Sequence, residues 1–266
     1  STTNTSVELN FSIIEDDLDE IKFNWNGTNY SVYDNSIVLM MNFDNISSIG
    51  DNDSTSTDLS QYNNHGDLLG NAGYNISGKD GSGLQLDGED DYMNLSHPSS
   101  LNITGAITIS LWERTADIDV TATWGMSIFG RGFYGDPRNT MDLRVRATGD
   151  TAVFGYEYGS GANSDYAIGT TDITDGNWHH IVAQWNGTDC LVYVDGSYEN
   201  STSCPNAPGP FDQGFVLGKS LNSSLENQVD FNGSIDELIV WNRSLSAEEI
   251  YQQYVSGWAY PDSPDQ

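Results

Sequence analysis

The sequence contains few basic residues and no long hydrophobic run. Nine lysines and arginines stand against 39 aspartates and glutamates, for a formal net charge of -30. Such a charge repels nucleic acid, which it excludes as a partner, and anionic membrane surfaces. No run approaches the roughly 18 apolar residues of a membrane-spanning helix, and Ser1 opens a polar stretch unlike a secretion signal. We therefore expect no membrane span, and a chain that is either mature or excised from a longer protein.

Cysteine and histidine are also scarce. The two cysteines, Cys190 and Cys204, lie 14 positions apart around Asp195-Gly196, a dipeptide that favours a type I′ hairpin turn. We expect a disulfide between them, as suits an oxidising compartment outside the cytoplasm. Two thiols and four histidines are a poor basis for a zinc site. These histidines are His65, His97, His179 and His180.

Asparagine, by contrast, is abundant and often begins an Asn-x-Ser/Thr sequon. Chance would place about five of the 25 asparagines in sequons, whereas fourteen are. The sequons begin at Asn4, Asn10, Asn26, Asn29, Asn45, Asn52, Asn75, Asn94, Asn102, Asn186, Asn200, Asn222, Asn232 and Asn242. We interpret them as N-glycosylation sites of an extracellular or cell-surface protein. An Asn/Ser/Thr-rich surface with accidental matches is the alternative.

Short alternating or compact apolar runs, bounded by Gly, Asn and Asp, predict an all-β sandwich of antiparallel strands. At 266 residues, one large domain is the expectation. A single short helix is predicted over 246–256, where Ser246 and Glu249 form a capping box. The predicted strands are Ile37 to Phe43, Leu84 to Leu86, Ile107 to Trp112, Met126 to Phe129, Leu143 to Val145, Ala152 to Tyr158, His180 to Trp185, Leu191 to Val194, Phe215 to Leu217 and Ile235 to Trp241.

We predict that residues 1–36 form a separate N-terminal β-ribbon ahead of a main domain at 37–266. Alternation predicts strands at Val7 to Ile13, Ile21 to Trp25 and Tyr30 to Tyr33. Three strands are too few for independent stability. The ribbon must pack on the main body, donate a strand to a neighbouring chain, or be the remnant of an immunoglobulin-like domain completed upstream.

Several phrases, taken in order, resemble one known family. They are "LMMNFD" with "DLSQYNNHGDL", then "GSGLQLDGEDDYMNL", "LNITGAITISLWER", "DGNWHHIVAQWNGTDCLVYVDGSY" and "FNGSIDELIVWNRSLSAEEI". From Val38 to about Gly257 the chain resembles the laminin-G-like, concanavalin A-like jelly roll of secreted and surface proteins. The resemblance implies a two-sheet jelly roll, and relatives often hold one structural calcium where the first and last strands meet. The matching positions are Asp44 and Asp236, with Asp87 or the Gly88 carbonyl nearby.

Asp236 has a second interpretation, which stays open: its carboxylate accepts backbone hydrogen bonds at a strand edge. Relatives of this fold also include glycoside hydrolases, which carry Glu-x-Asp-x-x-Glu on one strand. This sequence has no such string, so we expect no catalytic residues. Glu113 and Arg114 replace an apolar residue and a lysine of relatives, and we expect them to face an edge. His179 and His180 are expected to be structural strand residues.

Tyrosines suggest a ligand surface. Tyr134, Tyr156, Tyr158 and Tyr166 lie among glycines and acids, and aromatic faces can stack on sugars. An ordinary sheet surface is the alternative interpretation of these residues.

Three functions remain open. The first is a non-catalytic structural or adhesive glycoprotein that assembles with copies of itself through the N-terminal strands, as a filament or coat. The second is a carbohydrate- or protein-binding module of a larger secreted protein. The third is a glycoside hydrolase, which the missing carboxylates disfavour.

Overall fold

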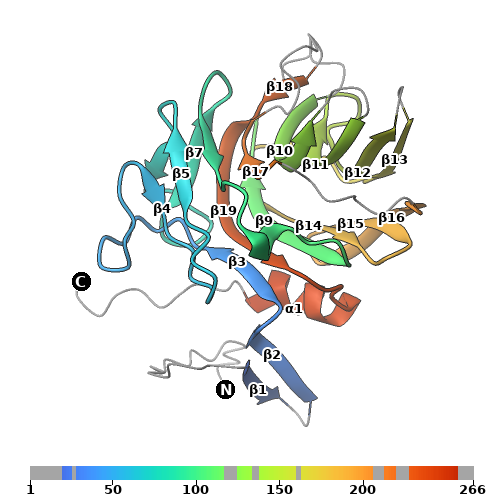
Figure 1. Cartoon of the computed structure of the whole chain (residues 1–266), viewed down its shortest axis with the longest axis horizontal. Coiled ribbons are helices and arrows are strands. Elements are labelled where there is room, and N and C mark those ends of the chain that lie inside the picture. Colours follow the sequence, from blue (N-terminus) through green and yellow to red (C-terminus); the bar gives the residue numbers. More distant parts are fainter. Residues whose placement is uncertain are drawn as a thin grey trace, which may run out of the picture.

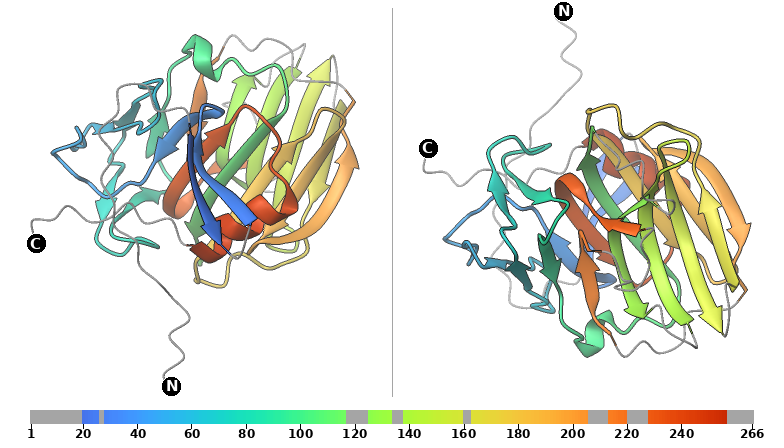
Figure 2. Two further views of the ribbon diagram at one scale, coloured as in Figure 1. Left: turned by 90° about the horizontal axis from the view of Figure 1, so that it is seen from below. Right: turned by 90° about the horizontal axis from the view of Figure 1, so that it is seen from above.

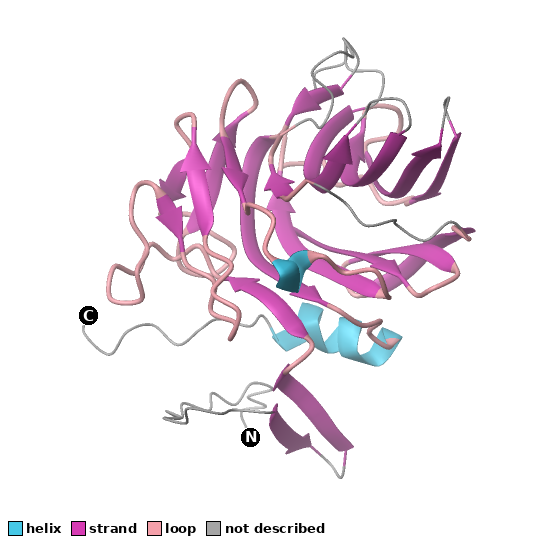
Figure 3. Ribbon diagram, viewed as in Figure 1, coloured by secondary structure: helices cyan, strands magenta, loops and turns pink. Residues whose placement is uncertain are grey.

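Two antiparallel sheets face each other in the computed structural model of the chain, which confirms the predicted sandwich (Figure 1). Strands dominate, and the helical segments drawn are one 3₁₀ turn and one α-helix (Figure 3). The structure describes residues 20–25, 28–116, 125–133, 138–159, 163–205, 213–219 and 228–256. The predicted strand from Val7 to Ile13 lies outside these residues.

The first sheet has nine strands, in the order β13-β12-β11-β10-β17-β8-β5-β4, with β18 pairing in parallel with β10. Its long strands β10 to β12 form antiparallel ladders with one another. The strands are β4 (Thr55–Ser56), β5 (Gly66–Leu69), β8 (Tyr92–Asn94), β10 (Gly125–Phe133), β11 (Arg138–Arg146), β12 (Thr151–Gly159), β13 (Asn163–Ile168), β17 (Phe215–Leu217) and β18 (Gln228–Asp230).

The second sheet has eight strands, in the order β16-β15-β14-β9-β19-β7-β6, with β3 also pairing with β19. The last strand therefore joins the first strand of the sandwich. The strands are β3 (Ile37–Met41), β6 (Gly73–Asn75), β7 (Gly83–Asp87), β9 (Ile107–Arg114), β14 (His179–Trp185), β15 (Asp189–Val194), β16 (Ser197–Ser203) and β19 (Asn232–Trp241).

The main core lies between the sheets, because alternate residues of each strand point inward. On β11 these are Met141, Leu143 and Val145, all fully buried. The rings of Phe129 and Phe215 stack with centroids 4.8 Å apart. The pattern that predicted each strand is thus the pattern that fills the core.

The β15–β16 hairpin turns at Asp195 and Gly196, both with positive φ, as the Asp-Gly pair predicts. Cys190 and Cys204 form a disulfide, with Cα atoms 5.6 Å apart. The disulfide crosses from the start of β15 to the residue that follows β16, so it fixes this hairpin at the edge of the sheet.

A smaller core lies on the outer face of the second sheet. Helix α1 (Ala247–Ser256) covers this face and buries Ile250 against Val182, Ile239 and Trp241. The predicted capping box is present: Ser246 N donates to Glu249 Oε2 (2.7 Å), and Glu249 N donates to Ser246 Oγ (3.2 Å). Seen from below, α1 lies across the sheet beside the N-terminal hairpin (Figure 2, left). The 3₁₀ turn η1 (Ser99–Leu101) lies elsewhere, ahead of β9.

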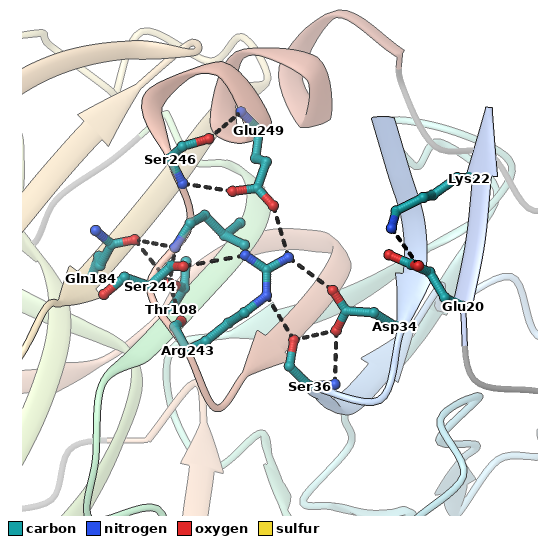
Figure 4. A network of polar contacts seen from close by, with 11 residues as sticks. Glu20, Lys22, Asp34, Ser36, Thr108, Gln184, Arg243, Ser244, Ser246 and Glu249 are labelled. Atoms are coloured by element: carbon teal, nitrogen blue, oxygen red, sulfur yellow. Dashed lines mark hydrogen bonds and ion pairs between the residues drawn. The ribbon is translucent and has the colours of Figure 1, made fainter. Parts of the chain in front are cut away.

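The N-terminal ribbon is a hairpin of β1 (Glu20–Trp25) and β2 (Thr28–Asp34) that forms its own two-stranded sheet. Its attachment to the sandwich runs through Arg243, just after β19 (Figure 4). The guanidinium donates to Asp34 Oδ2 (2.9 Å) and Ser36 Oγ (2.9 Å) and pairs with Glu249 Oε1 (2.8 Å). One side chain thereby joins the hairpin, the last strand and the helix.

The Arg243 network predicts a measurable loss of stability on truncation. Arg243→Met leaves two half-buried carboxylates, Asp34 and Glu249, without their cation. We expect the free energy of unfolding in urea to fall by about 1–3 kcal/mol, because hydrogen bonds to charged groups contribute about that much. Lys22→Met is the matched control: it removes an exposed pair with Glu20 and should change stability by about 0–1 kcal/mol. Equal losses in the two variants would contradict a role for Arg243 in holding the hairpin.

Candidate metal centre

Strand β19, the last strand, contains a bulge at the point where its pairing partner on one edge changes from β7 to β3. Along one edge, β19 pairs with β7 through Ile235 and then with β3 from Leu238 onward. On the other edge the ladder with β9 is interrupted between Asp236 and Ile239. Glu237, in the interruption, has φ of 50°, a left-handed conformation that is strained for glutamate. The fork between β3 and β7 therefore opens at two consecutive acidic residues.

Asp44 enters the same fork from the residues that follow β3. It lies between Phe43 and Asn45, whose φ values of 53° and 56° turn the chain sharply. Its Oδ1 accepts a hydrogen bond from Ser82 N (3.0 Å), and its Oδ2 accepts one from Asn42 Nδ2 (2.6 Å). A Cβ on Gly81 would lie 2.0 Å from Asp44 Oδ1, so only glycine allows this approach. The backbone is shaped around the carboxylate.

Asp236 is held in the same way from the other side. Its Oδ2 accepts hydrogen bonds from Lys79 N (2.7 Å) and Asp80 N (3.1 Å), and its Oδ1 accepts one from Glu237 N (2.9 Å). This is the backbone-acceptor interpretation that the sequence left open. Burial raises the pKa of Asp236 to about 8, against the effect of these hydrogen bonds, and the charge of Asp44 raises it further.

Glu237 completes a cluster of like charges, which we call the acidic fork: Asp44, Asp80, Asp236 and Glu237. Burial, followed by the charges of the other three, raises the pKa of Glu237 well above its usual range. Its side chain is almost fully buried, and its Oε1 has no hydrogen-bond partner. Buried carboxylates that repel one another, with an unsatisfied oxygen among them, suit a hard cation such as calcium, which takes oxygen ligands from loops.

The two other predicted ligands lie at the opposite end of β7. Asp87 pairs with Asn232, whereas Gly83, at the start of the strand, borders the acidic fork. Asp87 forms a separate group with Asp90 and Asp91, and carboxylate oxygens of these three lie within 4.8 Å of one another. Gly88 follows with φ of 80°. The structure thus divides the predicted ligand set into two acidic groups.

The Asp87 group satisfies its own buried member. Asp91 accepts hydrogen bonds from Asn71 N and from Asp87 N. Asp87 and Asp90 are exposed. Within the described residues, this group alone brings three potential metal-ligating side chains within 4.8 Å of one another, and exposed acidic groups are also stable without an ion. The acidic fork is the other candidate for a cation, on the burial of Asp236 and Glu237 and the unsatisfied Glu237 oxygen.

The tyrosines that were predicted to form a ligand surface do not lie together on one face of the first sheet. Tyr156 is 2 % exposed and packs against Phe154 and Trp185 in the core, so its assignment to a ligand surface is wrong. Tyr158, two residues further along β12, points to the same inward side of the sheet as Tyr156. Tyr166 points to the other face of the sheet. Tyr134 lies outside the described residues.

The ring of Tyr166 is already in use. The Arg144 guanidinium lies 4.2 Å from the ring centroid, and the Tyr166 hydroxyl donates to Glu157 Oε1 (2.9 Å). Arg144 also pairs with Asp142 (3.2 Å), which accepts a hydrogen bond from Ser127 Oγ (2.8 Å). This buried polar row crosses four strands of the first sheet. It stabilises the sheet through internal pairing, which leaves the ring face covered.

Glu113 does not face an edge, which corrects the expectation from sequence. In the sheet, Glu113 is paired with His179 of β14 and Ile235 of β19. It points to the same inward side of β9 as Leu111, so its side chain is fully buried. Among the described residues, neither carboxylate oxygen has a hydrogen-bond partner, and burial raises the pKa of Glu113 well above its usual range. Glu113 is therefore an acid inside the sandwich whose charged form is disfavoured. Arg114, next to it, lies over the Trp178 ring at 4.8 Å.

The two adjacent histidines occupy structural positions. His180 Nε2 lies 2.8 Å from Ser110 Oγ, and the ring forms a three-ring cluster with Trp112 (centroids 5.2 Å apart) and Tyr254 (6.1 Å), which also stack on each other at 5.7 Å. Burial lowers its pKa to about 3, so it is neutral. His179 lies between Asp195 (2.9 Å) and Asp175 (3.2 Å). Burial lowers the pKa of His179, but the hydrogen bonds that its ring donates to these carboxylates, together with their charges, outweigh this effect, and the net shift is upward.

Most sequon asparagines within the described residues lie in turns and at strand ends, and Asn200 lies within β16. The side chains of Asn45, Asn52, Asn102, Asn186, Asn200, Asn232 and Asn242 are exposed, and those of Asn75 and Asn94 are half-buried. In Asn52, Asn75, Asn94 and Asn186 the side-chain oxygen accepts a hydrogen bond from the backbone N–H two residues on. These turns give the motif a structural use beside its predicted role in glycosylation. The side chain of Asn29 and the sequons at Asn4, Asn10, Asn26 and Asn222 lie outside what the structure describes.

Sequence comparison now defines the class of protein. A family model for the concanavalin A-like lectin/glucanases superfamily matches residues 87–251, more than half of the chain. The chain belongs to this superfamily, as its resemblance implied. No curated protein sequence matches it. Across the described residues, no helix combines the length and the apolar character needed to cross a membrane.

Solved structures share the fold at low sequence identity. Domain 4 of AbnA, a GH43 extracellular arabinanase from Geobacillus stearothermophilus, matches with a TM-score of 0.63 and 19% identity over 82% of this chain and 97% of that chain. The binding domain of Paraclostridial Mosquitocidal Protein 1 matches with a TM-score of 0.61 and 16% identity, over 84% and 52%. The binding domain of botulinum neurotoxin serotype D matches with a TM-score of 0.61 and 16% identity, over 83% and 52%. The chain spans about half the length of the toxin binding domains.

Glu237 was not among the site residues predicted from the sequence. The signal that could have found it is the acid pair Asp236-Glu237 in an otherwise apolar strand, although strict alternation would place the two side chains on opposite faces. The bulge instead brings both acids to the fork. Asp80 had no signal of its own, because its place depends on the loop between β6 and β7.

The acidic fork predicts that metal-free protein loses stability as the pH rises. The folded-state pKa of Asp236, about 8, lies above its ordinary value of 3.8, so the folded state holds a proton that the unfolded state has lost. The stability that this proton contributes is full below about pH 4 and is lost as the pH rises through 8. We expect Tm, measured in a chelator, to fall over this range, and Glu237→Gln to reduce the fall. Asp87→Asn, in the separate group, is the matched control and should leave the slope unchanged. A slope unaffected by Glu237→Gln would contradict the proposed repulsion.

Proposed function

We propose that this chain is a non-catalytic carbohydrate-binding domain of a secreted or cell-surface protein, held rigid by calcium at the acidic fork. The observation that carries this proposal is the combination of a lectin/glucanase-superfamily sandwich with a buried acidic cluster between its first and last strands. Similar folds have been solved with sugars: domain 4 of the arabinanase with arabinotriose, and the serotype D ligand binding domain with N-acetylneuraminic acid.

The disulfide supports a location outside the cytoplasm, since such bonds persist in oxidising compartments. The fourteen sequons agree with this location and add N-glycosylation to the proposal. The acidic surface keeps the domain in solution and away from anionic surfaces.

The arrangement of acids on the first sheet supports a non-catalytic role. Asp142 on β11 and Glu157 on β12 face outward on neighbouring strands. Asp142 is paired with Arg144 and Ser127, and Glu157 accepts from Tyr166. Glycoside hydrolysis needs one carboxyl group to give up a proton and another to attack or activate water. Carboxylates occupied by internal partners are poorly placed for either task.

Calcium should stabilise the protein, and glycans should bind without being cleaved. At a calcium concentration 100 times its Kd, stability rises by about 2.7 kcal/mol, which for a chain of this size is a Tm increase on the order of 5 °C. Calorimetry with and without chelator measures this, and Glu237→Gln should abolish most of the increase while Asp87→Asn retains it. A glycan array tests binding. The proposal fails if no glycan binds with calcium present, and its non-catalytic part fails if a bound glycan is hydrolysed.

A second candidate function, self-assembly through the N-terminal strands, is favoured by one observation. The β1–β2 hairpin forms no ladder with either sheet of the sandwich among the described residues, and isolated two-stranded hairpins are marginally stable. A strand from a neighbouring copy would complete it through main-chain hydrogen bonds. Val7 to Ile13, six residues ahead of β1, is the alternating segment that we propose as the donor.

Deleting Ser1 to Glu15 tests this second function. The truncated chain should keep the Tm of the sandwich but sediment as a monomer at concentrations where the full chain forms larger species. Negative-stain microscopy of the full chain should then show filaments or closed assemblies. A full-length chain that stays monomeric at high concentration would rule the assembly out and leave the binding function untouched.

A further inference from the structure

An open hollow of about 420 Å³ lies beside the start of β3 and the end of β19, away from the acidic fork. Its floor contains the buried side chains of Val38 and Ile103, and its rim contains hydroxyl and amide groups together with the Tyr62 ring. Small-ligand sites commonly have volumes of about 300–1,000 Å³. The hollow has the size of such a site, and most of its accessible surface is polar.

The rim is fixed by hydrogen bonds that join three segments. Asn64 Nδ2 donates to the Val38 carbonyl (2.7 Å), and Ser100 Oγ donates to Asn64 Oδ1 (2.9 Å). Asn242 N donates to the Ser36 carbonyl, next to the hairpin. The 3₁₀ turn η1 and the ends of β3 and β19 are therefore held in place before any ligand arrives, which lowers the entropic penalty of binding.

Polar side chains on this rim are uncommitted. Within the described residues, the side chains of Ser99, Asn102, Thr104 and Asn242 have no hydrogen-bond partner, and all four are exposed. This distinguishes the hollow from the Tyr166 row, where Tyr166, Glu157, Arg144 and Asp142 each already have an internal partner. Hydroxyls and amides both donate and accept, so they match the hydroxyl groups of a sugar.

Tyr62 supplies an accessible aromatic face. The side chain is 38% exposed, and its hydroxyl reaches toward the Asn35 carbonyl at 3.5 Å. Its backbone N–H donates to Ser60 Oγ at 3.2 Å, which orders the turn that carries it. A ring anchored at its polar tip can present its face to the apolar side of a sugar ring.

Charge narrows the chemistry of the ligand. Among the described residues, the nine that line the hollow include no charged side chain, although the protein as a whole carries a formal charge of -30. The overall field repels anionic ligands. A cation would find no counter-charge in the lining. We infer that the hollow binds a neutral sugar ring, an inference that rests on the proposed carbohydrate-binding function and assigns it a site.

The sugar has two conceivable sources. Asn102 and Asn242 on the rim both begin sequons, so a glycan attached to either asparagine would lie over the hollow. A glycan from another molecule would present the same chemistry. Protein from a host without N-glycosylation and protein from a glycosylating secretory host separate the two sources, because the first offers the hollow only to added sugar.

Gly105 allows the hollow to be blocked without disturbing the fold. A Cβ at Gly105 would meet no atom within 4 Å, and the residue does not have a left-handed φ. Gly105→Gln should therefore fill the hollow while Tm stays constant. Gly73→Gln is the matched control, because a Cβ there would meet only the Asn71 carbonyl oxygen at 3.7 Å and Gly73 does not line the hollow. Tyr62→Ala removes the ring, and Tyr62→Phe keeps it.

The experiment is titration of unglycosylated protein with the neutral glycans that bind on an array, followed by saturation-transfer NMR. We expect Gly105→Gln and Tyr62→Ala to weaken binding at least ~10-fold, the scale of a lost ~1.4 kcal/mol contact, while Gly73→Gln and Tyr62→Phe bind as the wild type does. In glycosylated protein, loss of binding to added sugar that returns on glycan removal would support occupancy by the chain's own glycan.

The opposite results are equally clear. If wild type and Gly105→Gln bind the same glycans equally, the hollow is not the site and the carbohydrate-binding function stands. If wild-type protein binds no glycan in either preparation, the proposed function fails first. If the hollow binds peptides but no sugar, and Gly105→Gln abolishes that binding, the assignment of a sugar is overturned.

Discussion

The bulge at Asp236 and Glu237 is the constraint on which the other features of the second sheet depend. A strained, left-handed glutamate in a central strand costs on the order of 1–3 kcal/mol and persists only where its surroundings over-determine it. Here the strand pairings on both sides of β19 hold Glu237 in this conformation: β9 runs along one edge of β19, and β7 and then β3 run along the other. The bulge lets one strand serve two partners whose directions diverge.

Two groups of charged side chains lie along this strand. The acidic fork lies at its middle, where β3 and β7 separate, and Arg243 lies just beyond its C-terminal end. Repulsion at the fork works against folding unless protons or a cation offset it. Attraction at Arg243 secures the N-terminal hairpin and the C-terminal helix. The conformation of β19 therefore affects the fork and the hairpin together.

Much of the fold was predictable because strand period and turn chemistry are local. Met141 and Leu143 alternate into the core as their spacing predicts, and Asp195-Gly196 forms the expected hairpin turn. The capping box at Ser246 placed the helix. Glu113 was misjudged because the face on which a polar strand residue lies depends on its partners, and its partners are more than 60 residues away in sequence.

The site residues that the sequence analysis grouped together lie apart in the structure for a related reason. Asp87 and Asp236 belong to neighbouring strands, but the antiparallel register sets Asp87 opposite Asn232, so the two carboxylates lie at different ends of β7. Tyr156 and Tyr166 were grouped by composition, whereas pairing of Tyr166 with Gly155 puts the two rings on opposite faces of the sheet. Register across a sheet is set by the whole ladder, and single-residue patterns carry little information about it.

A polar surface can stabilise a fold or bind a ligand, but the same atoms rarely do both. In the row through Arg144 and Tyr166, hydrogen bonds and stacking already engage each side chain, so a sugar would have to break these contacts before making its own. Around the hollow the structural hydrogen bonds come from Asn64, Ser100 and the backbone, and among the described residues the side chains of Asn102 and Asn242 have no partner. The amides offered to a ligand on this rim are therefore separate from the amide that holds its shape. That difference, more than the abundance of aromatic residues, is the reason to propose the hollow as the sugar site.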